Sequence, residues 1–291
     1  MIGGVRIAIL GFGLIGGSIA RALRVHDGAS TFGPGLELVA WSRRPDGPTR
    51  ALEAGIVDHA APDPAIAIEG ADLIVLAAPP LASLALVDEL AGALRGALGR
   101  EATVTDVSST KRAIGDAADS AGLRFVGGHP MAGREASGFD AASPDLFVDR
   151  PWIICAGRHA APGDTHRVVA LARACRAHPI PMDPATHDRL TARVSHVPLV
   201  VSAALVEAMT ADPSWAEARG LAAGGWQSMS RLAAGDPTMG AGIAATNRPA
   251  IAAGLREVRT ALDGWIAALE TDTDPGDFEA RLRSARERLR P

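Results

Sequence analysis

The sequence is poor in several residue types that most proteins use freely. Its 291 residues contain no tyrosine and only two cysteines, and Lys111 is the one lysine among 29 basic residues. Asparagine also occurs once, at Asn247. A GC-rich coding bias explains such depletion wherever another residue type can substitute. The single lysine is therefore a candidate for a role that arginine cannot fill.

These shortages exclude several classes of protein. Cys155 and Cys175 have no partners at metal-ligand spacing, and a chain of this length needs no disulfide, so both are expected to pack as small apolar side chains. The formal charge of −4, with no long basic run, argues against nucleic-acid binding. No metal site is expected, because no two histidines have i, i+4 spacing.

Long apolar runs that could enter a membrane are also missing. The uncharged run 73–87 is short and is interrupted by Pro79 and Pro80. The run 7–20 resembles the core of a signal peptide, but its four glycines favour a turn over a helix of that kind. The sequence therefore predicts a soluble, cytoplasmic protein.

Hydrophobic residues, at 47%, are abundant enough for a large core, and the length corresponds to roughly two domains. Helical patterns alternate with short apolar runs typical of buried strands, which lie at 5–10, 36–41, 73–79, 102–107, 125–128, 152–157 and 180–182. This alternation predicts an α/β domain over 1–184, a Rossmann-like, doubly wound parallel sheet. Helical periodicity alone follows, which predicts an all-helical domain over 185–291.

A glycine-rich turn follows the first expected strand and opens a helix. Its sequence, Gly11-Phe12-Gly13-Leu14-Ile15-Gly16, has the G-x-G-x-x-G spacing of dinucleotide-binding proteins, in which glycines permit a tight turn and close approach of a pyrophosphate. We expect this segment to bind the cofactor.

The second expected strand ends without the acidic residue that usually binds the ribose of NAD. Ser42, Arg43 and Arg44 stand there instead, and arginine suits the additional phosphate of NADP. NADP is therefore favoured over NAD, the alternative being an exposed basic loop.

Further polar segments follow the later strands, and the carboxyl ends of such strands meet at the ligand crevice. Pro79, Asp106 and Ser108 are expected to line the cofactor site there. Ser109 and His129 should lie close together at the same edge. From the residues alone, His129 is either a general base or an ordinary loop histidine.

Five motifs in order carry a resemblance to a known family. They are GFGLIG, DVSSTK, GGHPMAGREASG, HDRLTARVSHVP and SRLAAGDP, and they span nearly the whole chain. In these motifs the chain resembles the prephenate and arogenate dehydrogenases of tyrosine biosynthesis. The resemblance implies oxidative decarboxylation of prephenate or arogenate with hydride transfer to NADP or NAD, and a homodimer formed through the helical domain.

The resemblance also implies roles for individual residues. His129 matches the histidine that accepts the proton of the ring hydroxyl, and Ser109 matches the serine that hydrogen-bonds this histidine and the substrate. Arg231 matches an arginine that holds a substrate carboxylate. His196 matches a histidine near the substrate, and Glu135 stands where some members have an acidic residue at the site entrance.

Other interpretations of these residues remain open at this point. Arg231 on a helix is also typical of a solvated surface, and His196 of helix packing. His187 with Asp188 could simply mark a helix start. Lys111 either binds a substrate carboxylate or holds the serine loop in place.

The substrate and the family also have alternatives. Many prephenate-using members have histidine where this chain has Leu199, and tryptophan and arginine where it has Gly240 and Ala241. Prephenate and arogenate therefore both remain candidates. The alternatives to this family are another hydroxy-acid or imino-acid dehydrogenase, which typically relies on a lysine in the helical domain that this chain lacks, and a non-catalytic dinucleotide sensor.

Overall fold

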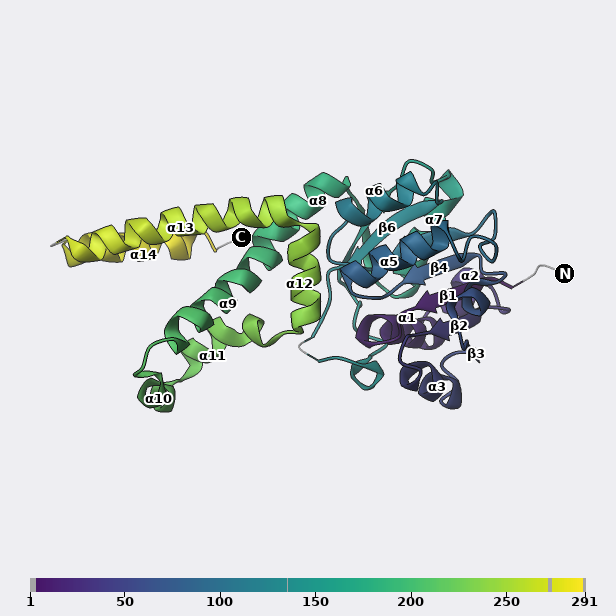
Figure 1. The fold of residues 1–291 in the computed structure, drawn as a ribbon, viewed down its shortest axis with the longest axis horizontal. Helices are drawn as coiled ribbons and strands as arrows, with labels where there is room; N and C mark the ends of the chain where they lie inside the picture. The colour runs from purple at the N-terminus through teal and green to yellow at the C-terminus, as the bar shows by residue number, and fades with distance from the viewer. Residues whose placement is uncertain (1–3, 135, 272–273, 290–291) are drawn as a thin grey trace.

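The computed structural model describes residues 4–134, 136–271 and 274–289. Eight strands form one sheet in the order β3-β2-β1-β4-β5-β6-β7-β8 (Figure 1). Their bounds are β1 (Arg6–Leu10), β2 (Glu37–Trp41), β3 (His59–Ala60), β4 (Leu73–Leu76), β5 (Thr103–Asp106), β6 (Phe125–Pro130), β7 (Pro151–Ala156) and β8 (His178–Pro181). The predicted Rossmann-like sheet is confirmed.

Helices cover both faces of the sheet because successive side chains of its strands point to opposite sides. Ile7 and Ile9 of β1 pack with α1 and α7, whereas Ala8 and Leu10 pack with α4, α5 and α6 on the other face. The elements connecting the strands are α1 (Leu14–Val25), α2 (Gly28–Phe32), α3 (Asp46–Glu53), α4 (Pro64–Ile68), α5 (Pro80–Ala91), α6 (Arg112–Ser120), the 3₁₀ turn η1 (Phe139–Ala141) and α7 (Pro162–Ala174). The order of strands reverses beside β1, which is where such folds bind ligands.

Two details of the sheet differ from the prediction. β7 runs antiparallel to β6, with His129 opposite Ile153, because a loop containing only η1 connects them and no crossover helix returns the chain to the other edge. β3 was not predicted, since two residues are too short for a recognisable pattern.

Beyond β8 the described residues contain no strand, and the helices extend away from the sheet (Figure 1). They are α8 (Pro184–Thr191), the π turn η2 (Ala192–His196), α9 (Val197–Thr210), α10 (Trp215–Ala218), η3 (Arg219–Leu221), α11 (Gly224–Ser230), η4 (Arg231–Ala234), α12 (Pro237–Thr246), α13 (Arg248–Glu270) and α14 (Pro275–Glu287). The last two form a projecting antiparallel pair, in which the rings of Trp265 and Phe278 lie 5.0 Å apart.

The π turn between α8 and α9 has an identifiable cause. Pro198 lies at the start of α9 and cannot donate a backbone hydrogen bond to the preceding turn. The helix accommodates this by widening over Ala192–His196. The stretch Pro184–Thr210 is long and apolar enough to cross a membrane, with a mean hydropathy of 1.3, but one such helix is weak evidence for a span.

The helical part docks on the helices that begin at the carboxyl edge of the sheet. A Cβ on Gly242 of α12 would lie 3.1 Å from Pro80 Cδ, so α12 packs directly on the start of α5. The hydroxyl oxygens of Thr110 and Thr246 form a hydrogen bond of 2.8 Å beside this contact. Cys155 and Cys175 are both buried and free, as expected for packing residues.

Candidate active site

The glycine-rich turn has the geometry that a dinucleotide needs. Gly11 has φ +98°, and a Cβ there would lie 2.5 Å from the Ala77 carbonyl oxygen. At Gly16 a Cβ would lie 2.2 Å from the Gly11 oxygen, so the chain itself requires these two glycines. A Cβ on Gly13 would meet nothing within 4 Å. Gly13 thus keeps space open at the N-terminus of α1, where backbone N–H groups suit a pyrophosphate.

The other residues of the motif face the protein more than the ligand. Phe12 is 4% exposed, and its ring packs 5.5 Å from that of Phe139 in η1. The turn η1 therefore covers the side chain of Phe12, and the predicted contact of this segment with the cofactor stays a prediction. Leu14 and Ile15 are half-buried and pack against the core.

The segment after β2 remains accessible. Ser42 is half-buried and both Arg43 and Arg44 are exposed. Within the part of the chain that the structure describes, neither arginine forms an ion pair. Their guanidinium groups are free to meet a phosphate.

Asp106 at the end of β5 is the centre of a buried polar cluster. Its Oδ2 accepts hydrogen bonds from the Ser108 amide at 3.0 Å and from the Lys111 ammonium, and its Oδ1 accepts one from the Gly128 amide at 3.2 Å. Asp106 is completely buried. Protein donors thus use both oxygens of the Asp106 side chain, and the predicted contact of this residue with the cofactor stays a prediction.

Lys111 is 2% exposed and donates to Asp106 and to the Gly128 carbonyl, the latter at 2.6 Å. The expectation that it binds a substrate carboxylate is wrong, because the ammonium is enclosed by protein. The alternative, that it holds the serine loop, agrees with these contacts. Ser108 also packs inside, 3.3 Å from the Ser83 hydroxyl, while Pro79 is half-buried at the start of α5.

His129 lies near the end of β6, at the carboxyl edge of the sheet, and is 8% exposed. Its Nδ1 lies 2.8 Å from Nε2 of His187 in α8. No described residue hydrogen-bonds to the other ring nitrogen, Nε2. Burial, with smaller contributions from His187, Lys111 and His196, holds the pKa of His129 well below 6.5. The ring is therefore neutral near pH 7 and able to accept a proton.

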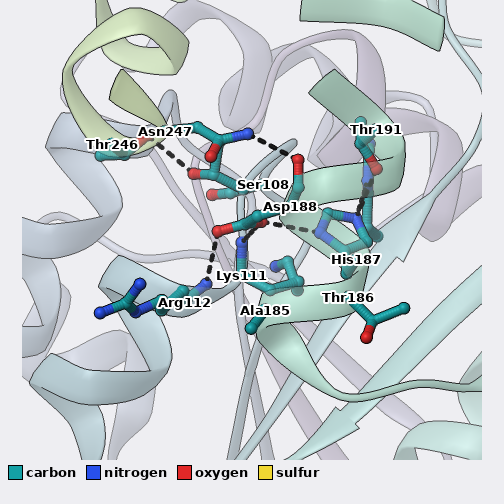
Figure 2. Close-up of polar contacts among 12 residues, drawn as sticks. Ser108, Lys111, Arg112, Ala185, Thr186, His187, Asp188, Thr191, Thr246 and Asn247 are labelled. Carbon is teal, nitrogen blue, oxygen red and sulfur yellow. Dashed lines mark hydrogen bonds and ion pairs between the residues drawn. The ribbon is translucent and has the colours of Figure 1, made fainter. Parts of the chain in front are cut away.

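Sequence reasoning missed the partners of His129. His187 Nδ1 lies 2.8 Å from Asp188 Oδ1, and the Asp188 carboxylate also accepts hydrogen bonds from the backbone N–H groups of Lys111 and Arg112 (Figure 2). The adjacent His-Asp pair was a visible signal. This pair is also compatible with a helix start, and nothing in the sequence places His187 beside His129.

His196 is fully buried, and its Nδ1 lies 3.1 Å from Nδ2 of Asn247. Asn247 also donates to the Asp188 carbonyl at 2.8 Å (Figure 2). Burial lowers the pKa of His196 to about 4, although Asp188 and the Ser109 backbone oppose this. The burial of this side chain agrees with the packing interpretation, although its Nε2 has no hydrogen-bond partner among the described residues, and the predicted substrate contact stays a prediction.

Ser109 and Arg231 are the two remaining described residues that were predicted to act at the substrate. Ser109 is half-buried after β5, but the structure has no hydrogen bond between Ser109 and His129, whose Nδ1 is bonded to His187. Arg231 is exposed at the start of η4. Ser202 fixes the backbone around η4 by donating to the Met229 carbonyl at 2.7 Å and accepting from the Ala233 amide at 3.1 Å. Glu135 lies outside the described residues.

The departures from the family pattern lie together. A Cβ on Gly240 of α12 would approach Leu199 Cδ2 of α9 at 3.7 Å. Leu199 and Gly240, two of the positions that depart from the family pattern, thus lie next to each other and carry no polar side chain.

Comparison with known proteins identifies this arrangement. Sequence models of the prephenate dehydrogenase nucleotide-binding domain and dimerization domain match residues 20–180 and 183–283. The chain belongs to the prephenate dehydrogenase family. It is an NAD(P)-dependent dehydrogenase of that family, which sets aside the alternatives of another dehydrogenase family and of a non-catalytic sensor.

Individual relatives support the same assignment. The chain is 31% identical to the prephenate dehydrogenase of Bacillus subtilis over 91% of its own length and 68% of that protein. Synechocystis arogenate dehydrogenase is 30% identical, with a TM-score of 0.78 over 98% of this chain and 99% of that one. The fold of A. aeolicus prephenate dehydrogenase, solved with hydroxyphenyl propionate and NAD+, matches with a TM-score of 0.84 at 24% identity, covering 98% of both chains.

Proposed function

We propose that this protein oxidatively decarboxylates prephenate to 4-hydroxyphenylpyruvate, or arogenate to tyrosine, in tyrosine biosynthesis. The observation that carries the proposal is His129, a buried neutral histidine with no described partner on Nε2, at the sheet edge that also carries the glycine-rich turn. Relatives named as prephenate and arogenate dehydrogenases support both substrates.

The proposed reaction needs a residue that accepts the hydroxyl proton, whereas the return to an aromatic ring favours the decarboxylation by itself. A nicotinamide dinucleotide held at the glycine-rich turn would supply the acceptor for the hydride that leaves the ring carbon bearing the hydroxyl. His129 accepts the hydroxyl proton at Nε2, since the hydroxyl is far too weak an acid to ionise alone. Loss of the ring carboxylate as carbon dioxide then restores aromaticity. Orientation of the ring is left to the protein.

We assign the carboxylate contact to Arg231 and a hydroxyl contact to Ser109. An arginine holds a carboxylate through two parallel hydrogen bonds, and Arg231 is exposed on the helical part. Ser109 is half-buried in the loop that follows β5. Both assignments are carried over from the family's motifs.

NADP is the proposed preferred cofactor. Arg43 and Arg44 are exposed after β2, with Ser42 beside them and no acidic residue in this segment to bind the ribose of NAD. Guanidinium groups at this place suit the 2′-phosphate.

We also propose a homodimer formed through the helical part. Large apolar side chains are exposed there, including Val194, Leu262, Ile266, Leu269 and Leu282, and the matching family model for these residues is described as a dimerization domain. A cytoplasmic location is proposed too, because Pro184–Thr210 includes Asp188, whose carboxylate is hydrogen-bonded to the start of α6.

One assay tests the reaction. Purified protein is incubated with NADP or NAD and with prephenate or arogenate, and the absorbance of reduced nicotinamide is followed. We expect turnover in at least one of the four combinations, and a loss of about 10²-fold or more in kcat for His129→Asn with cofactor binding retained. Absence of turnover in all four would contradict the proposal.

A further inference from the structure

The hydrogen bonds at His129 continue through two more residues. Nδ1 of His129 lies 2.8 Å from Nε2 of His187, and Nδ1 of His187 lies 2.8 Å from Oδ1 of Asp188. His187 and Asp188 are 1% and 5% exposed. Such buried polar chains are costly unless every member is satisfied, so the protons in this one have little freedom.

The position of each proton follows from Asp188. Its Oδ1 lies 2.8 Å from the Lys111 amide nitrogen and its Oδ2 lies 3.1 Å from that of Arg112. Backbone N–H groups can only donate, so both Asp188 oxygens act as acceptors. The third contact, at His187 Nδ1, then requires a proton on that nitrogen.

The same reasoning continues to His129. A neutral imidazole with its hydrogen on Nδ1 has a lone pair on Nε2. His187 Nε2 is therefore an acceptor, and His129 must donate to it from Nδ1. The Thr191 hydroxyl, 3.3 Å from His187 Nε2, can also donate to this lone pair and does not disturb the assignment.

We propose that His187 and Asp188 are positioning residues that hold His129 in the tautomer with hydrogen on Nδ1 and a lone pair on Nε2. The step that this serves rests on the proposed function: the substrate hydroxyl loses its proton and Nε2 of His129 gains it. His129 then carries a positive charge. The hydrogen bond to His187, backed by the Asp188 carboxylate, becomes stronger as that charge develops.

The surrounding charges fit this role. The Lys111 ammonium, paired with Asp106, lies on the β5–β6 side, and the neutral ring of His196 faces from the π turn. Burial is the main cause that lowers the pKa of His129, and His187, Lys111 and His196 lower it further, so the ring is neutral in the free enzyme.

The tautomer can be read without substrate by ¹⁵N NMR of protein labelled at histidine, with signals assigned from His129→Asn and His187→Gln. We expect His129 to carry its hydrogen on Nδ1 in the wild type and to gain the Nε2–H form in His187→Leu. A wild-type His129 protonated on Nε2 would overturn the proposal, as would an unchanged tautomer in His187→Leu.

Kinetics separate positioning from packing. His187→Leu removes both hydrogen bonds and should lower kcat by about 10- to 100-fold, the range typical for partners that orient an active-site histidine, with little change in KM. His187→Gln keeps an acceptor for His129 and should recover most of the loss. If His187→Leu folds and keeps wild-type kcat, the proposal is wrong. If His187→Leu does not fold, kcat of His187→Gln and the tautomer of His129 in the wild-type ¹⁵N spectrum still test the proposal.

Failure of the proposed reaction is distinguishable from failure of this inference. Absence of turnover in the wild type contradicts the reaction and leaves the NMR result to stand alone. Normal turnover together with an unperturbed tautomer in His187→Leu contradicts only the positioning role. Thr191→Val serves as the control, because it alters the same helix while both His187 bonds remain.

Discussion

The ammonium of Lys111 and the carboxylate of Asp106 form an ion pair between the end of β5 and β6 that has almost no contact with solvent, at 1% and 0% side-chain exposure. The Gly128 carbonyl and the amides of Ser108 and Gly128 complete its hydrogen bonds. A pair of this kind contributes little net stability, but removing one partner leaves a buried charge. The cluster therefore tolerates loss of both charges better than loss of one.

Lys111→Met is expected to destabilise the protein by about 3–5 kcal/mol, because Asp106 loses its counter-charge. The double variant Lys111→Met with Asp106→Leu should recover part of that loss. Chemical denaturation measures both. A double variant less stable than Lys111→Met would contradict this account.

Lys111→Arg is expected to destabilise as well, although the charge is kept. Lys111 is 2% exposed and its ammonium contacts both Asp106 and the Gly128 carbonyl, so the larger guanidinium cannot take the same position without moving its neighbours. The reverse exchange at the neighbouring exposed residue, Arg112→Lys, should change stability by less than about 0.5 kcal/mol. Equal thermal stability of the two variants would mean that the lysine survives by chance.

Two alanine substitutions in the glycine-rich turn should affect different properties, one the cofactor affinity and the other the stability of the fold. Gly13→Ala places a methyl group in open space, so the fold should persist while the dissociation constant for NADP or NAD rises. Gly16→Ala places it 2.2 Å from the Gly11 oxygen and should cost about 1–3 kcal/mol of stability. Calorimetric titration and thermal melting separate the two; unchanged cofactor binding by Gly13→Ala would show that the pyrophosphate does not approach there.

Arg43→Asp tests the cofactor preference. It removes a phosphate ligand and adds a carboxylate where NAD-binding relatives of this fold place one, so the ratio of kcat/KM for NADP over NAD should fall by about tenfold or more. The matched control is Arg95→Asp, since Arg95 follows α5 at the opposite edge of the sheet and is also exposed. A ratio that is the same in both variants would remove the basis for preferring NADP.

His196 should make stability depend on pH. Its folded-state pKa is lowered to about 4 from 6.5 by burial, so the unfolded chain binds more protons than the folded one between these values. The contribution of His196 is intact above pH 6.5 and is lost as the pH falls toward 4. His196→Gln should flatten the decline in unfolding free energy over this range, and an identical slope in both proteins would contradict the assignment.

Much of the fold could be predicted from local patterns. The strands of the parallel sheet and helix 14–25 follow from apolar runs and glycine spacing, which are properties of neighbouring residues. β7 was placed correctly along the chain, but its direction depends on how the loop before it returns, and no local pattern encodes that. The helical pattern at 165–177 predicts a helix there, and α7 begins three residues earlier because Pro162 starts it.

The site was harder to predict because its contacts join distant segments. His129 and His187 are 58 residues apart in sequence, and the hydrogen bond between them depends on how the helical part docks. Lys111 was expected either to bind a substrate carboxylate or to hold the serine loop, and only the structure shows that Asp106 is its partner inside the protein. For both residues the motifs located the right region and left the contacts undetermined.

Asp188 contacts the start of α6 through its carboxylate, holds His187 with the same group and accepts from Asn247 through its carbonyl. The residue that would take the substrate proton thus belongs to the sheet, while the residues that orient it belong to the helices that follow. Any shift of the helical part against the sheet would loosen the base together with the substrate-binding face. The hydrogen bonds that orient His129 therefore form only when the helical part is docked on the sheet.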